Sequence, residues 1–224
     1  MTLNNVSRVN RSKQEARENY NRLSRWYDII AGSTEEKYRR LGMALLDVQP
    51  GESVLEVGFG TGHCLIRFAE DVGPDGAVFG IDLSDEMAAI AYERAVGWGV
   101  DNLVHLLLGD GTHPPFCSKK FDSIFMSFTL ELFDTPEIPD VLAHCRSILS
   151  PNGRMVIVTM AKSENPGIPE RIYEWFHSKM PVAVDCRPIT AQIFLHEAGF
   201  TVNQVLQEMM WGLPVEIILA KPTS

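Results

Sequence analysis

The chain has 224 residues, of which 45% are hydrophobic, so it can bury one substantial core. Its formal net charge of −9 argues against a nucleic-acid partner, because binding to a phosphate backbone depends on neutralising Lys and Arg side chains. Four cysteines without a C-x-x-C pair and six histidines without an H-E-x-x-H element predict reduced thiols, no metal site and a cytoplasmic protein.

The first predicted element is an amphipathic helix between Gln14 and Ile30, where apolar residues recur at alternating steps of four and three. The first 25 residues carry six basic and two acidic side chains, a local charge of +4. Such a basic segment forms either a solvated helix face or a peripheral contact with an anionic membrane, and both interpretations stay open. A second helix, predicted from Thr34 to Val48, ends before a Pro-Gly pair that introduces the first strand.

A glycine-rich loop follows this strand. Val54 to Val57 is a short apolar run typical of a buried parallel strand, and Gly58, Gly60 and Gly62 follow at alternate positions. Because a helix pattern begins directly afterwards, the loop lies where open α/β sheets bind nucleotide-like ligands. A dinucleotide loop has the spacing G-x-G-x-x-G, whereas the third glycine here comes one residue early. The spacing therefore argues against a dinucleotide.

The next two strands end at carboxylates. Ala77 to Asp82 is a predicted strand that ends in an aspartate, and Asn102 to Leu108 is a third apolar run followed closely by Asp110. In nucleotide-binding sheets, a carboxylate at the end of the second strand accepts hydrogen bonds from both ribose hydroxyls of the ligand. This feature predicts a ribose-containing ligand without distinguishing between its kinds.

Strands and helices alternate up to about residue 160, which predicts a doubly wound parallel sheet. A polar loop then leads to a short helix at residues 170–179 and another at 190–198. Two final strands, at 200–205 and 215–220, are joined through residues 209–212. They predict an antiparallel closing pair, which fits a seven-stranded sheet.

Five features between Val54 and Val158 together resemble the class I S-adenosylmethionine-dependent methyltransferases. They are the G-x-G-x-G loop with an acidic residue in the preceding strand, the two strand-end carboxylates, the Phe121-Asp122 pair before an apolar strand, and a turn similar to L-x-P-G-G, with Asn152 for the first glycine. The resemblance implies an α/β fold with a doubly wound, Rossmann-like seven-stranded sheet whose closing strand is antiparallel. Residues 1–48 would form an N-terminal helical lid and residues 49–224 the methyltransferase domain.

The same resemblance implies S-adenosyl-L-methionine as the cofactor, with its ribose bound by Asp82 and its adenine by Asp110. The cofactor-binding residues that it implies are Tyr27, Glu56, Gly58, Gly60, Thr61, Gly62, Asp82, Leu83, Asp110, Gly111 and Ser127.

The predicted N-terminal helix indicates which families of methyltransferases the chain resembles most. Its end, Tyr20-Asn21-Arg22-Leu23-Ser24-Arg25-Trp26-Tyr27-Asp28, is similar to the (F/Y)-x-x-x-A-x-x-Y-D helix of the ubiquinone/menaquinone-biosynthesis C-methyltransferases, and bacterial phosphatidylethanolamine N-methyltransferases begin in a similar way. In such enzymes this helix covers the cofactor. Ser127-Phe128-Thr129-Leu130 is similar to the quinone family's S-F-G-L, but that family continues with Arg-Asn where this chain has Glu131-Leu132. The resemblance implies a quinone precursor or an amine-bearing lipid as the acceptor. That the acceptor is small and largely apolar is predicted from aromatic and Met residues in the segments that this fold leaves for substrate, namely Tyr27, Trp175, Phe176, Met180 and Trp211.

Methyl transfer requires an acceptor held in line behind the methyl group, so orientation supplies most of the acceleration. A general base is needed only for some acceptors, and the candidates are Tyr27, His113, Glu131 and His177. Each candidate also has an interpretation without a catalytic role. Tyr27 would pack on the apolar face of its helix, and His113 would lie in a solvated loop. Glu131 would cap a helix, and His177 would stand at the tip of an amphipathic helix. Two other functions stay open, a non-catalytic S-adenosylmethionine-binding or regulatory subunit and an NAD(P) oxidoreductase, although the glycine spacing and the closing strands oppose the second. The sequence specifies neither the acceptor atom nor the oligomeric state.

Overall fold

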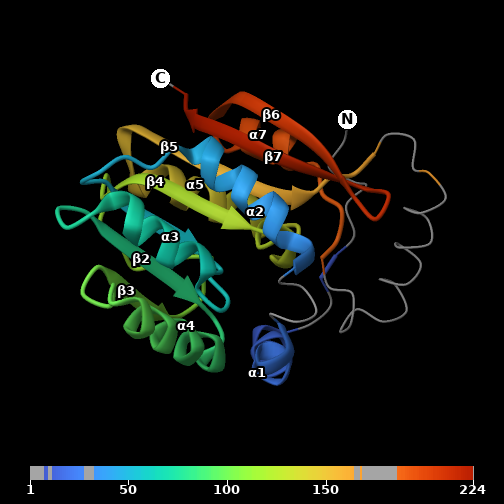
Figure 1. Ribbon diagram of the computed structural model, residues 1–224. Coiled ribbons are helices and arrows are strands. Elements are labelled where there is room, and N and C mark those ends of the chain that lie inside the picture. The colour runs from blue at the N-terminus through green and yellow to red at the C-terminus, as the bar shows by residue number, and fades with distance from the viewer. Residues whose placement is uncertain (1–7, 10–11, 28–32, 164–166, 168–185, 224) are drawn as a thin grey trace.

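A seven-stranded sheet runs through the centre of the protein in the order β3-β2-β1-β4-β5-β7-β6 (Figure 1). The computed structural model describes residues 8–9, 12–27, 33–163, 167 and 186–223. Strands β1 to β5 pair in parallel, and β7 runs antiparallel to both β5 and β6. The predicted Rossmann-like sheet with an antiparallel closing strand is confirmed. The strands are β1 (Ser53–Val57), β2 (Ala77–Asp82), β3 (Val104–Leu108), β4 (Phe121–Ser127), β5 (Leu149–Met160), β6 (Phe200–Met210) and β7 (Leu213–Pro222).

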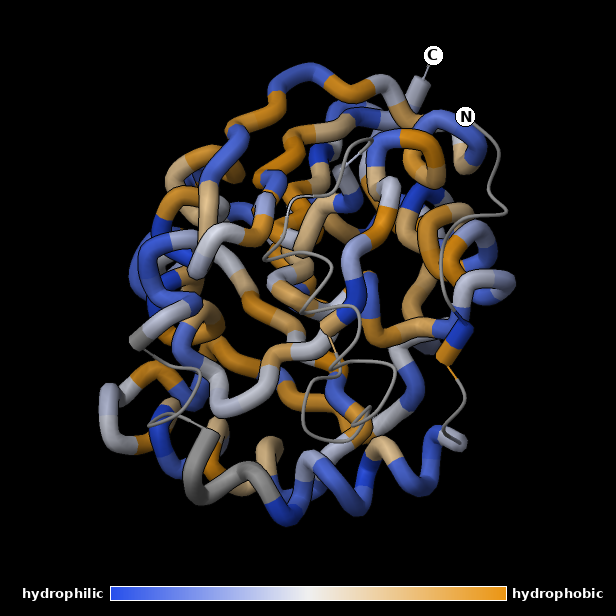
Figure 2. Tube along the Cα trace, turned by 90° about the vertical axis from the view of Figure 1, so that its right-hand side faces the viewer, coloured by the Kyte–Doolittle hydropathy of each residue, from blue (hydrophilic) through white to orange (hydrophobic). Residues whose placement is uncertain are grey.

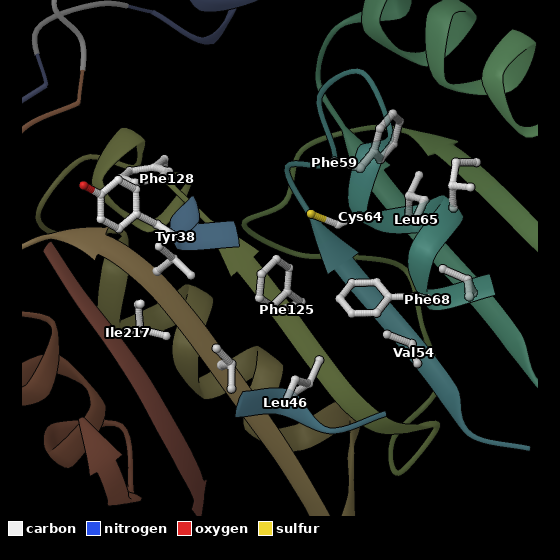
Figure 3. Close-up of a cluster of buried hydrophobic side chains, with 14 of the residues drawn as sticks. Tyr38, Leu46, Val54, Phe59, Cys64, Leu65, Phe68, Phe125, Phe128 and Ile217 are labelled. Carbon is white, nitrogen blue, oxygen red and sulfur yellow. The ribbon is translucent and has the colours of Figure 1, made fainter. Parts of the chain in front are cut away.

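Helices cover both faces of the sheet. Those of one face are α2 (Ser33–Leu46), α3 (His63–Val72) and α4 (Asp85–Trp98), and those of the other are α5 (Ile138–Ile148) and α7 (Ala191–Glu197). On the first face Phe68 of α3 meets Phe125 of β4 with ring centroids 5.3 Å apart (Figure 3). On the second, Leu142 of α5 and Phe194 of α7 are buried against the strands. Figure 2 shows hydrophobic stretches of the chain crossing the interior and hydrophilic ones mostly at the outside, as two apolar sheet faces require.

The strand order places a crevice next to β1. This strand lies between β2 and β4, and the helices that follow β1 and β4 pack on opposite faces of the sheet. Open α/β sheets bind ligands at such a switch point, outside the carboxyl ends of the strands. The glycine loop after β1 and the residues after β4 therefore face the same space.

Several strand boundaries differ from the prediction. The last two strands extend toward each other, so that Met209 and Met210 belong to β6 and only Trp211 and Gly212 form the turn, with φ angles of 53° and 81°. Positive φ at both positions is typical of the two-residue turns that match the twist of a hairpin. Strand β5 begins at Leu149, because the predicted turn residues 150–153 form an irregularity within the strand. The predicted helix at 170–179 lies outside the described residues.

The two N-terminal helices pack differently. Helix α2 lies on β4, β5 and β7, with Tyr38 and Leu46 buried in the core, whereas α1 (Lys13–Tyr27) lies beside α4. The predicted division at residue 48 thus groups a helix of the core with a helix outside it. Among the described residues, no helix is long and apolar enough to cross a membrane.

Candidate active site

A cavity of about 580 Å³ opens at the carboxyl ends of β1, β2 and β4. Its walls come from the strand ends, from the β4–α5 loop (residues 128–137) and from the N-terminal segment, by which we mean the described residues 8–9 and 12–27. The lining residues are Arg8, Val9, Ser12, Lys13, Ala16, Tyr20, Val57, Gly58, Gly60, Ile81, Asp82, Leu83, Met87, Asp110, Gly111, Ser127, Phe128, Thr129, Leu132, Phe133, Asp134, Pro136 and Glu137.

Backbone N–H groups of the glycine loop and of the turn between β2 and α4 orient the carboxylate of Asp82. The N–H of Gly60 donates to Asp82 Oδ2 at 2.9 Å, and the N–H of Ser84 donates to Asp82 Oδ1 at 2.9 Å. Burial raises the pKa of Asp82, and these two N–H groups act in the opposite direction by stabilising the charged form. Since each carboxylate oxygen has about two lone pairs, both oxygens keep a position for a ligand hydroxyl.

Asp110 is held in a similar way, but one of its partners comes from α1. Its Oδ1 accepts from the N–H of Thr112 at 2.9 Å and from Thr112 Oγ1 at 2.7 Å, and its Oδ2 lies 2.5 Å from Lys13 Nζ. Burial opposes ionisation, yet the hydrogen bonds from Lys13 and Thr112 hold the pKa of Asp110 below its usual value. Lys13 Nζ also lies 3.0 Å from Glu137 Oε1, so it bridges two acidic residues on different walls of the cavity.

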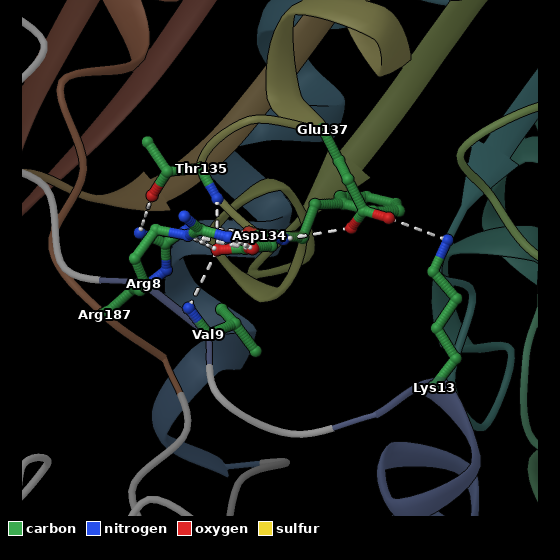
Figure 4. A network of polar contacts seen from close by, with 8 residues as sticks. Arg8, Val9, Lys13, Asp134, Thr135, Glu137 and Arg187 are labelled. Carbon is green, nitrogen blue, oxygen red and sulfur yellow. Dashed lines mark hydrogen bonds and ion pairs between the residues drawn. The ribbon is translucent and has the colours of Figure 1, made fainter.

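The N-terminal segment is fixed to the β4–α5 loop by a second contact (Figure 4). Arg8 Nε and Nη2 lie 2.9 Å and 2.6 Å from the two carboxylate oxygens of Asp134, and the N–H of Val9 donates to Asp134 Oδ1 at 3.0 Å. The hydrogen bond from Arg8 lowers the pKa of Asp134. This fork geometry is the strongest that an arginine makes with a carboxylate.

A third contact joins α1 to the start of α4. Asp85 Oδ1 accepts from Arg17 Nε at 3.0 Å and from Asn21 Nδ2 at 2.8 Å, and Ser84 Oγ donates to Asn21 Oδ1 at 2.6 Å. The hydrogen bonds from Arg17 and Asn21 lower the pKa of Asp85 to about 2. Basic residues of the N-terminal segment are therefore matched by acidic residues around the cavity.

Seven of the predicted cofactor-binding residues line the cavity: Gly58, Gly60, Asp82, Leu83, Asp110, Gly111 and Ser127. Three others, Glu56, Thr61 and Gly62, are not among its described lining residues. Glu56 and Thr61 are buried, and burial raises the pKa of Glu56 well above its usual value. A Cβ on Gly62 would lie 2.8 Å from the Cβ of Ala91 in α4, so this glycine permits close packing of the loop on that helix. The side chain of Tyr27 lies outside the described residues.

Of the four predicted general bases, the structure describes the side chains of two, His113 and Glu131, and neither lies at the cavity. His113 is exposed, with its ring centroid 5.7 Å from that of His144. Glu131 is completely buried, with Oε1 accepting from the N–H of Met160 at 3.2 Å, and burial raises its pKa to about 7. Neither lines the cavity, and His177 lies outside the described residues. The sequence reasoning did not single out Arg8, Lys13, Asp134 or Glu137, although the positive charge of the N-terminus was a signal for the first two.

Comparison with known proteins assigns the reaction class. The family model of a methyltransferase domain matches residues 54–153, which contain the glycine loop, Asp82 and Asp110. A demethylmenaquinone methyltransferase of Listeria monocytogenes serotype 4a is 29% identical over 182 residues, which are 81% of this chain and 74% of the relative. The chain is a class I S-adenosylmethionine-dependent methyltransferase. This result does not favour the oxidoreductase or the non-catalytic subunit.

Other methyltransferases with different acceptors are also similar. The nocamycin O-methyltransferase of Saccharothrix syringae is 35% identical over 160 residues, which are 70% of this chain and 52% of the relative. The solved structure of the 1,6-didemethyltoxoflavin-N1-methyltransferase of Burkholderia thailandensis contains bound S-adenosylhomocysteine. It matches this chain with a TM-score of 0.70 and 19% identity, over 98% of this chain and 95% of the other. The latter likeness supports the fold alone. Similar methyltransferases thus act on unlike molecules, and the acceptor has to be argued from the cavity.

The described residues fit the cofactor, S-adenosylmethionine, which supplies an electrophilic methyl group when bound. The carboxylate of Asp82 keeps acceptor positions for two hydroxyls, and its orientation is set by backbone N–H groups rather than by a counter-ion. Gly58 and Gly60 line the cavity without side chains, so the backbone can approach a ligand closely.

Proposed function

We propose that this methyltransferase acts on a small, largely apolar acceptor, such as a quinone precursor or an amine-bearing lipid. The observation that carries the proposal is the apolar lining contributed by the N-terminal segment and the β4–α5 loop, namely Val9, Ala16, Phe128, Leu132 and Phe133. Burial of apolar surface stabilises a complex by roughly 25 cal/mol per Å², so such walls favour a prenyl or acyl chain over a free amino acid. The name of the Listeria relative supports a quinone precursor.

The cofactor assignments are part of the same proposal. Asp82 would accept hydrogen bonds from the ribose hydroxyls, and Asp110 would accept one from the adenine amino group beside Lys13 Nζ. Both oxygens of Asp110 already accept hydrogen bonds, but Oδ2 has a second lone pair. Gly58, Gly60 and Gly111 would let the cofactor approach the backbone.

We further propose that the N-terminal segment is a lid that closes over bound cofactor. Support comes from its position as one wall of the cavity and from its contacts with Asp110, Asp134 and Asp85. Because Arg8, Lys13 and Arg17 pair with acidic residues of the same chain, these three side chains favour a lid over the alternative of a membrane-bound helix.

The chemistry that follows is one of orientation. No histidine is among the described residues that line the cavity, and the lining carboxylates accept hydrogen bonds from backbone N–H groups, Lys13 or Arg8. The described lining residues therefore act by holding the acceptor in line with the methyl group, and the proton that a quinol or a protonated amine loses on methylation would pass to solvent water rather than to a lining histidine or carboxylate.

The experiment is a transfer assay with S-adenosylmethionine labelled in its methyl group and a total lipid extract. Label should appear in the organic-soluble fraction, and the Asp82→Ala variant should transfer much less of it. A naphthoquinol with a prenyl chain and an aminophospholipid, tested separately, would then separate the two acceptor classes. Label found only on water-soluble metabolites, protein or RNA would disprove the apolar acceptor and leave the methyltransferase assignment intact.

A further inference from the structure

Arg187 is a completely buried cation that donates hydrogen bonds to three residues of the β4–α5 loop. Nε donates to the carbonyl of Glu131 at 3.1 Å, Nη1 to Thr135 Oγ1 at 2.8 Å, and Nη2 to the carbonyl of Phe133 at 2.5 Å. A buried charge is costly unless it is hydrogen-bonded, and here the planar guanidinium holds three points of one short loop. Burial lowers the pKa of Arg187 to about 10, so it stays charged at neutral pH.

The backbone next to Arg187 is anchored to the sheet. The N–H of Ile189 donates to the carbonyl of Met160 at 3.0 Å, and the N–H of Lys162 donates to the carbonyl of Ile189 at 3.0 Å, which extends β5 by a parallel bridge. The sheet therefore holds the backbone that carries the guanidinium in place. The guanidinium connects the end of β5 to the loop that follows β4.

The loop that Arg187 holds carries two acidic partners of the N-terminal segment, Asp134 and Glu137. Asp134 binds Arg8 and the N–H of Val9, and its own N–H donates to Glu137 Oε2 at 3.2 Å. Glu137 Oε1 in turn pairs with Lys13. Figure 4 shows this continuous network, in which Thr135 joins Arg187 to Asp134 by donating its N–H to Asp134 Oδ1 and accepting from the guanidinium.

We propose that Arg187 is a positioning residue for cofactor binding: it fixes the β4–α5 loop so that Asp134 and Glu137 hold the N-terminal segment closed. Arg187 does not line the cavity and acts through the loop. The inference rests on the proposed lid and adds to it the residue that aligns the lid's acidic partners.

The first measurement tests the lid itself. Amide hydrogen exchange of α1 in the wild-type protein should slow when S-adenosylhomocysteine binds, because closure buries and orders the helix. If binding does not change this exchange, the lid proposal fails before Arg187 is considered.

The second measurement tests Arg187. In Arg187→Gln, S-adenosylhomocysteine should bind roughly tenfold more weakly, as expected when several hydrogen bonds to a charged group are lost. Exchange in α1 of the bound variant should be fast, while amides of β1 and β4 keep their protection. Arg146→Gln is the matched control, since this exposed arginine of α5 donates to the carbonyl of Ala198 and does not line the cavity. It should bind with wild-type affinity.

A double-mutant cycle separates positioning from general destabilisation. Arg8→Gln alone should weaken binding about two- to fivefold, the range of an exposed ion pair, but should change nothing further when added to Arg187→Gln. If Arg187→Gln does not fold, Thr135→Val replaces it, since it removes one acceptor of the guanidinium and keeps the charge. The inference is overturned if the fold-changes in affinity of the two single variants multiply in the double variant. It is also overturned if amide hydrogen exchange in α1 of the bound Arg187→Gln variant stays as slow as in the bound wild type.

Discussion

Two glycines of the loop after β1 should respond very differently to substitution by alanine. Gly62 has a φ of +81°, and an added Cβ would lie 2.8 Å from the Cβ and 3.1 Å from the Cα of Ala91. The left-handed backbone costs an L-residue about 1–2 kcal/mol, and overpacking against a helix costs about 1–3 kcal/mol more. Gly62→Ala should therefore lower the free energy of unfolding by about 2–5 kcal/mol.

Gly60→Ala should instead act on binding. Gly60 has a φ of +52°, an added Cβ meets no protein atom within 4 Å, and the residue lines the cavity. Gly60→Ala should therefore lower the free energy of unfolding only by the cost of a left-handed backbone, about 1–2 kcal/mol. The methyl group, however, would occupy space at the cavity wall, so S-adenosylhomocysteine should bind more than about tenfold more weakly, a loss of at least 1.4 kcal/mol.

Urea unfolding and calorimetric titration with S-adenosylhomocysteine measure the two effects separately. The folded fraction of Gly62→Ala should bind within a few-fold of the wild type, which makes each variant the control for the other. Unchanged binding by Gly60→Ala, or a greater loss of stability in Gly60→Ala than in Gly62→Ala, would refute the assignment of these two roles.

Two further predictions concern single carboxylates. Asp82→Ala should weaken S-adenosylhomocysteine binding at least about tenfold, since hydrogen bonds to a charged acceptor contribute roughly 1.5–3 kcal/mol; an affinity within a factor of two of the wild type, measured by calorimetry, would rule out the ribose contact. Glu131 has a pKa raised from 4.5 to about 7 by burial, so the folded protein holds this proton more tightly than the unfolded chain, and stability should fall as pH rises from 4.5 to 7. Glu131→Gln removes this dependence on pH. The free energy of unfolding of the variant minus that of the wild type should therefore rise by about 2–4 kcal/mol between pH 4.5 and 8, at about 1.4 kcal/mol per pKa unit. If urea unfolding gives the same difference at every pH, the assigned pKa is wrong.

The sequence alone determined the sheet and the half of the cavity that the glycine loop, Asp82 and Asp110 form. Val54 to Val57, the glycines after it and the aspartates after the next two strands are local patterns, and parallel strands bring their carboxyl ends to one edge whatever the rest of the chain does. Asp82 and Asp110 therefore had to lie near the glycine loop. The strand ends were less well predicted, because a long hairpin such as β6–β7 is extended by pairing rather than by the pattern of either strand.

Only the tertiary structure decided which residues meet across that edge. Lys13 and Asp110 are 97 positions apart and Arg8 and Asp134 are 126 apart, so no local spacing could pair them. The positive charge of the N-terminus was visible in the sequence, but whether it faces solvent, a membrane or the protein depends on where α1 packs. Arg187 is the clearest case: an isolated arginine has no sequence pattern that marks it as buried, and its role follows from the three loop acceptors that the fold places around it.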